Sequence, residues 1–183
     1  HTVAVGDTRL TAAKIVITTG ARAALPPIPG LADAGALTNE TVFDLQEQPK
    51  RLGVIGAGPI GCELAQSFAR LGSEVHVFEM AERPIPLEAE EAGTLLAEQL
   101  RKDGVNLHLG TAAKGIHQRG AARIIETEHG DIEVDQVLVA LGRKPNIESL
   151  NLDAAGVSSD PRKGIVVNDK LQTSNPRIYA AGD

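Results

Sequence analysis

The chain has 183 residues, of which 42% are hydrophobic, and its formal net charge at pH 7 is −6. This length allows one domain with a well-buried core, or one domain with parts of another. The charge argues against a nucleic-acid partner, no apolar run is long enough for a membrane span, and one cysteine cannot form an internal disulfide.

The N-terminal quarter of the chain predicts short strands and a crossover. Residues 3–5, the turn Gly6-Asp7 and the apolar run 14–18 indicate a strand pair. Because a compact domain would not normally open inside a strand pair, we expect a further portion of the fold before the first residue. Three prolines within 21–29 predict extended chain without an element of its own, and residues 41–46 predict a short helix.

Residues 51–79 predict a strand, a glycine turn, a helix and a second strand. The apolar run 51–55 is typical of a strand buried in a parallel sheet, and apolar residues at helical spacing then continue to Gly72. A helix that begins at the turn directs free N–H groups and its positive dipole end toward it, which makes the turn a phosphate site. The residues predicted to line this site are Gly56, Ala57, Gly58, Pro59, Ile60 and Gly61.

Each glycine of this G-x-G-x-x-G turn has its own steric reason. Gly56 permits the tight turn, Gly58 lets a pyrophosphate approach the backbone, and Gly61 lets the helix pack closely on the strand. Kinase phosphate loops share this spacing, but the chain has none of the V-A-I-K, H-R-D and D-F-G motifs that a kinase needs. The flanking strand and helix therefore favour a dinucleotide site.

Glu79 ends the second predicted strand, at the position where a dinucleotide site needs a carboxylate. Such a carboxylate accepts hydrogen bonds from the adenosine ribose hydroxyls and repels the additional phosphate of NADP. Arg83 is an opposing signal, because an arginine shortly after this strand could bind that phosphate, although Glu82 beside it offsets its charge. We predict NAD(H) in preference to NADP(H).

The rest of the central region predicts two more parallel strands. A helix is expected over 88–103 and a strand over 105–109, while short β-prone pieces in 114–135 predict an antiparallel meander in place of a helix. A buried strand is expected at 136–141. The inward stripe predicted for the helix consists of Leu95, Leu96 and Leu100. The predicted fold class is α/β, a Rossmann-like parallel sheet with a β-meander crossover.

Cys62 and two groups of titratable residues each allow a chemical and a structural interpretation. Cys62 on the first helical turn could be a reactive thiol, but we expect a small residue that packs behind the glycine turn. Glu88, Glu90 and Glu91 could act as acids or bases, yet on a first turn they more simply complement the helix dipole. The histidines lack the paired spacing of zinc sites, so no metal is predicted.

Four motifs together support a family resemblance. They are Thr18-Thr19-Gly20 with its proline-rich exit, GPIGCELA at 58–65, LGRKPN at 141–146 and TSNPRIYAAGD at 173–183. Nearly the whole chain resembles the flavin-dependent pyridine nucleotide–disulfide oxidoreductases, the family of dihydrolipoamide dehydrogenase, glutathione reductase and mercuric reductase. The resemblance implies that 47–148 is an NAD(H)-binding domain, and that 1–46 and 149–183 are incomplete segments of an FAD-binding domain.

The resemblance also implies cofactor positions outside the glycine turn. Those expected in the NAD(H)-binding domain are Glu63, which would lie close to the flavin, and Ala113 and Gly142, which would line the nucleotide groove. Those expected to contact FAD in the intact enzyme are Thr19, Gly20, Ala21 and Asp183. The family's C-x-x-x-x-C pair, first FAD glycine motif and C-terminal dimerisation domain are not in this sequence, so no catalytic residue is assigned.

The predicted function is nucleotide binding within an FAD-dependent oxidoreductase. In the intact enzyme hydride would pass between NAD(H) and FAD and on to a cysteine pair, while these 183 residues alone would bind nucleotide without turnover. One alternative is a non-catalytic NAD(H)-binding or sensor module, and another is the same enzyme class acting on mercuric ion or on lipoamide. We expect a cytoplasmic enzyme that is a homodimer when intact, with exposed apolar surface on the incomplete flanking segments.

Overall fold

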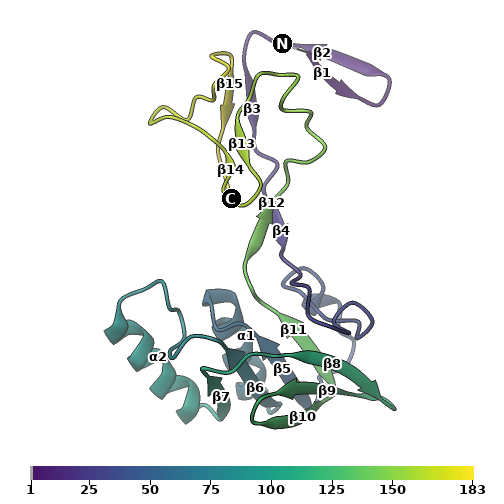
Figure 1. Ribbon diagram of the computed structural model, residues 1–183, viewed down its shortest axis with the longest axis vertical. Helices are drawn as coiled ribbons and strands as arrows, with labels where there is room; N and C mark the ends of the chain where they lie inside the picture. Colours follow the sequence, from purple (N-terminus) through teal and green to yellow (C-terminus); the bar gives the residue numbers. More distant parts are fainter. Residues whose placement is uncertain (1) are drawn as a thin grey trace. The chain divides into compact units, whose positions relative to one another are not determined.

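The computed structural model describes residues 2–183 (Figure 1). They divide into two compact units, one formed by residues up to Arg22 together with Arg143–Asp183, and the other by Ala23–Gly142. Among the described residues, no helix has the length and apolar character to cross a membrane. The glycine turn lies in the larger unit.

A four-stranded parallel sheet forms the centre of the larger unit. Its strands are β5 (Arg51–Ile55), β6 (Glu74–Glu79), β7 (Val105–Leu109) and β11 (Gln136–Val139), in the spatial order β11-β5-β6-β7 (Figure 1). Two helices, α1 (Pro59–Arg70) and α2 (Glu90–Lys102), connect β5 to β6 and β6 to β7. The sheet and its two crossover helices confirm the predicted α/β class.

The first face of this sheet packs against the helices. Leu52 and Val54 from β5 share a buried cluster with Val75 and Val77 from β6 and with Leu100 from α2. All five side chains have no measurable exposure to solvent. The alternation along each strand explains the pattern, because every second side chain of a strand points to the same face.

The second face is covered by a three-stranded antiparallel meander, β8 (Gly115–Arg119), β9 (Ala122–Thr127) and β10 (Gly130–Val134). Ile125 and Val134 of the meander share a buried cluster with Phe78, Val137 and Val139 of the sheet. The meander therefore takes the place that a third crossover helix would have, as the sequence predicts.

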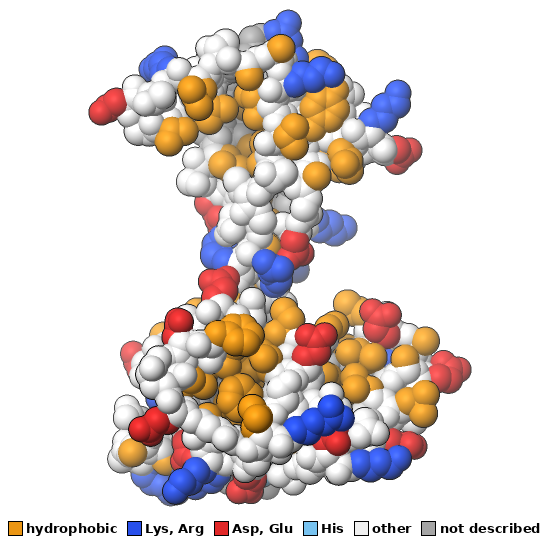
Figure 2. Space-filling model, turned by 180° about the vertical axis from the view of Figure 1, so that it is seen from behind, with side chains coloured by type: hydrophobic (Ala, Val, Ile, Leu, Met, Phe, Trp, Pro, Cys, Tyr) orange, Lys and Arg blue, Asp and Glu red, His pale blue; other side chains and the backbone are white. Residues whose placement is uncertain are grey.

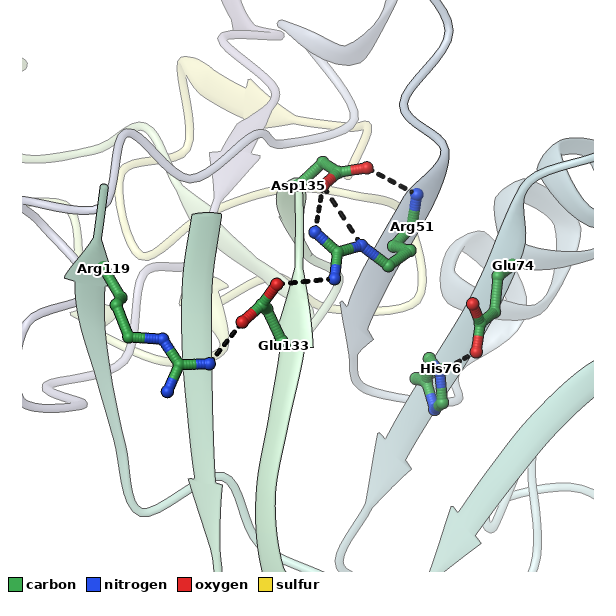
Figure 3. Close-up of polar contacts among 6 residues, drawn as sticks. All are labelled: Arg51, Glu74, His76, Arg119, Glu133 and Asp135. Atoms are coloured by element: carbon green, nitrogen blue, oxygen red, sulfur yellow. Dashed lines mark hydrogen bonds and ion pairs between the residues drawn. The ribbon is translucent and has the colours of Figure 1, made fainter. Parts of the chain in front are cut away.

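A chain of charged side chains joins the meander to the amino end of β5 (Figure 3). Arg51 donates from Nη2 to Asp135 Oδ1 at 2.6 Å and from Nη1 to Glu133 Oε1 at 2.7 Å, and Arg119 pairs with the same glutamate. Asp135 also accepts a hydrogen bond from the Arg51 backbone N–H at 2.8 Å. Arg51 lowers the pKa of Asp135, and Arg119 followed by Arg51 lowers the pKa of Glu133.

Two histidines far apart in sequence meet on the sheet. His76 of β6 and His108 of β7 stack, and His76 Nδ1 lies 3.0 Å from His108 Nε2. Glu74 lies 3.1 Å from the other ring nitrogen of His76 (Figure 3). Phe78 stacks on His108 from the opposite side along the strand, with ring centroids 4.9 Å apart. Burial, with a smaller contribution from His76, lowers the pKa of His108, so this ring is neutral at pH 7.

The smaller unit consists of short strand pairs. The hairpin β1 (Thr2–Val5) and β2 (Thr8–Thr11) is antiparallel, and β3 (Ile15–Ile17) pairs in parallel with β15 (Ile178–Ala180). The other two pairs are β4 (Ala21–Ala23) with β12 (Arg143–Pro145), and β13 (Ser159–Asp160) with β14 (Gly164–Ile165). A small buried cluster contains Leu152, Val157 and Ile178.

Apolar side chains at the surface accompany this small core (Figure 2). The large ones exposed in the smaller unit are Val3, Val5, Leu10, Val16, Val166, Val167 and Leu171. The sequence predicts such exposure for the flanking segments.

Four local predictions differ from the structure. The strand that pairs with β1 is Thr8–Thr11 and not residues 14–18, which contribute the strand that pairs with β15. Residues 21–29 include the strand β4, and residues 41–46 form only a single 3-10 turn, η1 (Val42–Asp44). Leu95 is 67% exposed, since the buried positions of α2 are a glycine, an alanine and Leu100.

Candidate dinucleotide-binding site

The predicted nucleotide residues of the larger unit follow the carboxyl ends of four neighbouring strands. The glycine turn follows β5, Glu79 ends β6, Ala113 comes four residues after β7, and Gly142 comes three residues after β11. Strand order reverses between β5 and β11, because the chain runs from β5 outward to β7 and then returns to the other side of β5. In open parallel sheets, ligands bind at the carboxyl edge beside such a switch point.

The glycine turn is tightly packed at two of its glycines and open at the third. Gly56 has φ +103°, and a Cβ atom there would lie 2.6 Å from the Ala140 carbonyl oxygen. A Cβ at Gly61 would lie 2.1 Å from the Gly56 carbonyl oxygen, whereas a Cβ at Gly58 would meet nothing within 4 Å. The backbone at Gly58 is thus open on the side where a side chain would point.

Helix α1 begins directly at this open space. Gly58 is its N-cap and Pro59 its first residue, and no side chain caps its N-terminal end. The remaining residues of the turn differ in exposure, since Ala57 is fully buried, Ile60 is half-buried and Pro59 is exposed. The positive end of the helix dipole therefore faces the turn without a protein anion bound to it through a capping hydrogen bond.

Glu79 contacts the glycine turn directly. Its Oε2 accepts a hydrogen bond from the Ala57 backbone N–H at 2.8 Å, and its Oε1 accepts one from the Ala81 N–H at 2.9 Å. A carboxylate offers about four lone-pair positions, so the half-buried Glu79 has acceptor capacity left for ribose hydroxyls. The structural role of Glu79, which the sequence did not reveal, is to hold the turn in place.

Arg83 lies in the loop after β6 and binds the backbone of that loop. Its Nη1 donates to the Ile85 carbonyl at 3.2 Å and its Nη2 to the Pro86 carbonyl at 3.0 Å. Ile85 in turn donates its N–H to the Ala57 carbonyl at 2.8 Å. The guanidinium group is therefore engaged within the loop.

Cys62 packs behind the turn, in agreement with the structural interpretation of this residue. The side chain is 4% exposed, and its Sγ donates to the Ala57 carbonyl at 3.3 Å. Burial, followed by the charges of Glu79 and Glu63, raises the pKa of the thiol to about 11. A thiol with this pKa is almost fully protonated at pH 7 and is a poor nucleophile.

Ala113 and Glu63 occupy different surroundings at this edge of the sheet. Ala113 is half-buried and packs against the cluster that contains Phe78 and Val137. Glu63, the fifth residue of α1, is exposed. Gly142 is exposed, with φ +97°, a conformation that a side chain would disfavour.

In the smaller unit, three of the predicted flavin residues line one hollow. Thr19, Gly20 and Asp183 border a cavity of about 440 Å³. Asn146, to which the sequence assigned no separate role, fixes this region, because its N–H donates to the Gly20 carbonyl at 2.9 Å and its carbonyl accepts from Thr19 Oγ1 at 2.8 Å.

Two further polar contacts near this hollow involve Arg143. It forms an ion pair with Asp183 and donates from Nη2 to the Ala21 carbonyl at 2.8 Å. Ala21 itself is half-buried in β4. Hence Asp183 has a cationic neighbour, which the sequence did not indicate because the two residues are far apart in the chain.

The described part of the chain, residues 2–183, has no cluster of three or more histidine, cysteine, aspartate or glutamate side chains arranged to hold a metal ion.

Comparison with known proteins identifies, for the whole chain, the family that its four sequence motifs resemble. The family model described as pyridine nucleotide-disulphide oxidoreductase matches residues 1–183. The chain is 42% identical to the mercuric reductase of Staphylococcus aureus over 186 residues, which cover 100% of this chain and 34% of that protein. It is also 42% identical to the dihydrolipoyl dehydrogenase of Bacillus subtilis over 149 residues, which cover 80% of this chain and 32% of that protein.

Solved structures agree with these relatives. The HOCl-induced flavoprotein disulfide reductase RclA of Escherichia coli superposes with a TM-score of 0.90 at 34% identity, over 97% of this chain and 41% of that one. The chain thus spans about a third of the length of the curated relatives that it matches. It belongs to the pyridine nucleotide-disulphide oxidoreductases, a family of enzymes that use FAD and a pyridine nucleotide.

Proposed function

We propose that the carboxyl edge of the β11-β5-β6-β7 sheet binds NAD(H), and that the intact enzyme transfers hydride between this nucleotide and FAD and on to a cysteine pair. The main supporting observation is the contact of Glu79 with the Ala57 N–H beside an open Gly58. A carboxylate at the end of β6 and an unfilled space at the turn are the two features that a dinucleotide requires.

The residues present fit an adenine dinucleotide. The backbone from Gly56 to Gly61 and the N-terminal end of α1 would hold the pyrophosphate, while Glu79 would accept the ribose hydroxyls. Ala113 and Gly142 would line the groove on either side. When bound, the nicotinamide supplies a hydride or accepts one, and these residues orient it and hold its charged groups.

The preference for NAD(H) over NADP(H) is part of this proposal. The Glu79 carboxylate would lie where NADP carries its additional phosphate, and the resulting repulsion favours NAD. Arg83, the opposing signal in the sequence, donates to two carbonyls of its own loop instead of facing open space. Both observations support the same choice.

The proposal for FAD concerns the smaller unit and Glu63 of α1. Thr19, Gly20 and Ala21 would contact the adenosine half of FAD, and Asp183 would accept a hydrogen bond from a ribityl hydroxyl. The hollow of about 440 Å³ beside Thr19 and Asp183 supports this assignment. Glu63 would lie near the flavin in the intact enzyme, and its exposure on α1 leaves it available for such a contact.

We further propose that residues 47–148 are the NAD(H)-binding domain, with 1–46 and 149–183 belonging to the FAD-binding domain. The compact unit Ala23–Gly142 includes most of the first range. A disulfide or mercuric ion would be the final electron acceptor, in line with the names of the relatives. A cytoplasmic, homodimeric enzyme, without turnover by these 183 residues alone, completes the proposal on the basis of the family resemblance.

Calorimetric titration of the chain with NADH and, separately, with NADPH tests the proposal. We expect tighter binding of NADH, and a loss of about tenfold in NADH affinity for Glu79→Gln, which corresponds to about 1.4 kcal/mol. Glu82→Gln is the matched control, because it removes an exposed carboxylate three residues further along the chain and should leave the affinity unchanged. Equal or tighter binding of NADPH would refute the preference, and no binding of either nucleotide would refute the site.

A further inference from the structure

The loop between β6 and α2, residues 80–89, contains a residue in an unfavourable backbone conformation. Ile85 has φ +43°, in the left-handed region that β-branched residues very rarely adopt. Such conformations persist only where neighbouring groups hold them, and they concentrate at functional sites. Ile85 lies directly beside the glycine turn, because its N–H donates to the Ala57 carbonyl at 2.8 Å.

Arg83 supplies the contacts that hold this conformation. Its two terminal nitrogens donate to the carbonyls of Ile85 and Pro86, at 3.2 and 3.0 Å. The Ile85 carbonyl also accepts a hydrogen bond from the Glu88 N–H at 3.0 Å, which closes the turn. A planar guanidinium can bind two carbonyls at once, which a lysine ammonium on its flexible stem does less well.

Helix α2 leaves room for this arginine at a glycine. A Cβ atom at Gly93 would lie 3.1 Å from Arg83 Nη1, 3.3 Å from Arg83 Cδ and 2.9 Å from the Pro84 carbonyl oxygen. Gly93 is the fourth residue of α2 and is buried, and glycine has a lower helix propensity than alanine. The close approach of Arg83 gives a physical reason for a glycine at this position.

The loop and β6 together hold the backbone N–H and the carbonyl of Ala57 in the glycine turn. Ala57 donates its N–H to Glu79 Oε2 at 2.8 Å and accepts at its carbonyl from the Ile85 N–H at 2.8 Å. Ala57 is fully buried, so its backbone groups bond to these protein partners and have no contact with solvent. The orientation of the next peptide, at Gly58, therefore depends on the position of Ile85.

We propose that Arg83 is a positioning residue for the dinucleotide site and not a ligand of a 2′-phosphate. It holds Ile85 in its left-handed conformation, and Ile85 holds Ala57 so that the backbone at Gly58 faces the pyrophosphate. This inference rests on the proposed function, since it assumes a dinucleotide at the turn. It assigns Gly93 as the position on α2 that makes room for the arginine.

The test compares Arg83→Met with the wild-type chain in two measurements. Methionine keeps an unbranched stem against Gly93 and removes both donors. In titrations with NADH and NADPH we expect Arg83→Met to weaken both by the same factor, about five- to tenfold, so that the ratio of the two affinities is unchanged. A loss of NADPH affinity alone would show a phosphate ligand and overturn the proposal, as would no change for either nucleotide.

The second measurement needs no nucleotide. Hydrogen exchange of the Ile85 amide should be at least about tenfold faster in Arg83→Met, because the amide loses its fixed position against the Ala57 carbonyl. An unchanged exchange rate would overturn the proposal. Failure of the wild-type chain to bind NADH or NADPH would refute only the proposed function, because the exchange measurement still tests the role of Arg83.

Two further variants complete the design. Arg119→Met is the matched control, since Arg119 pairs with Glu133 in the meander at the other end of the sheet, and neither measurement should change. Arg83→Lys serves if the methionine variant does not fold. With one donor group in place of a planar pair, it should restore part of the nucleotide affinity and part of the Ile85 protection, and full restoration of both would overturn the requirement for two donors.

Discussion

At the scale of single residues, the glycines of the turn have separable roles. Gly61 is required by packing, because a Cβ there would overlap the Gly56 carbonyl oxygen at 2.1 Å. Gly58 has open space beside it and an ordinary φ of −69°, so nothing in the free protein requires a glycine at this position. The proposed pyrophosphate gives a reason for glycine at Gly58, because a side chain there would occupy the space that the ligand needs.

This difference predicts opposite effects of two alanine substitutions. Gly61→Ala should lower the free energy of unfolding by about 2 kcal/mol or more, because overpacking against backbone outweighs the better helix propensity of alanine. Gly58→Ala should cost less than about 1 kcal/mol, the difference between glycine and alanine at an N-cap, and yet weaken NADH binding strongly. Urea unfolding and NADH titration of both variants check this.

A large loss of stability in Gly58→Ala, or unchanged NADH affinity, would contradict the proposed place of the pyrophosphate. Gly61→Ala shows in the same urea experiment how much stability is lost where a Cβ meets backbone, and the wild-type chain is the reference for NADH affinity.

At the scale of elements, the position of the meander on the sheet depends on a glycine within β5. A Cβ at Gly53 would lie 2.4 Å from Ile125 Cδ1 of β9 and 3.4 Å from Val134 Cγ2 of β10. Both meander side chains are completely buried. The close contact between β5 and the meander explains why a glycine occurs in the middle of β5, among the apolar residues Leu52, Val54 and Ile55.

This contact predicts coupling between Gly53 and Ile125. Gly53→Ala alone should destabilise the chain by about 1–3 kcal/mol through overpacking, and Ile125→Val alone by about 1 kcal/mol through the lost methyl group. The double variant should lose about 1 kcal/mol less free energy of unfolding than the sum of the two single losses, because valine lacks the Cδ1 atom that the new Cβ meets. Strictly additive losses in urea unfolding would argue against the contact.

At the scale of the whole molecule, the acidic side chains that join the meander to β5 make stability depend on pH. Arg51 lowers the pKa of Asp135 in the folded chain, while the unfolded value is about 3.9. A carboxylate with a depressed folded pKa stabilises the fold above its unfolded pKa. That stabilisation is lost as the pH falls through the folded value.

We therefore expect Asp135→Asn to have a defined pH signature. The difference in urea midpoint between wild type and variant should be constant from pH 7 to pH 5 and should shrink below about pH 4, because Asp135 of the unfolded wild-type chain then becomes protonated while the folded chain still holds the carboxylate ionised. Comparing the wild-type and variant midpoints at each pH cancels the pH dependence that other carboxyl groups with lowered pKa values, such as Glu133, give to both chains. A difference that grows on acidification would contradict the assigned sign.

The sequence by itself determined the strand, glycine turn, helix and second strand over residues 51–79, and the structure has them as β5, α1 and β6. It also determined the meander in place of a helix. These features follow from local signals, namely the period of apolar residues, glycines where only glycine fits, and turn residues between short strands. The position of Glu79 at the carboxyl end of β6 was predictable for the same reason, because the apolar pattern indicates where that strand ends.

Only the tertiary structure decided which groups these residues contact. The bonds from Glu79 to Ala57, from Arg83 to its own loop, and between Asp183 and Arg143 are set by strand order and loop conformation. The stacking of His76 on His108 likewise needs two neighbouring strands in one register. The bonds of Arg83 depend on the conformation of one loop, and the other three pairings join residues 22 to 40 positions apart. No periodicity in a single sequence encodes them, because they depend on how separate elements pack.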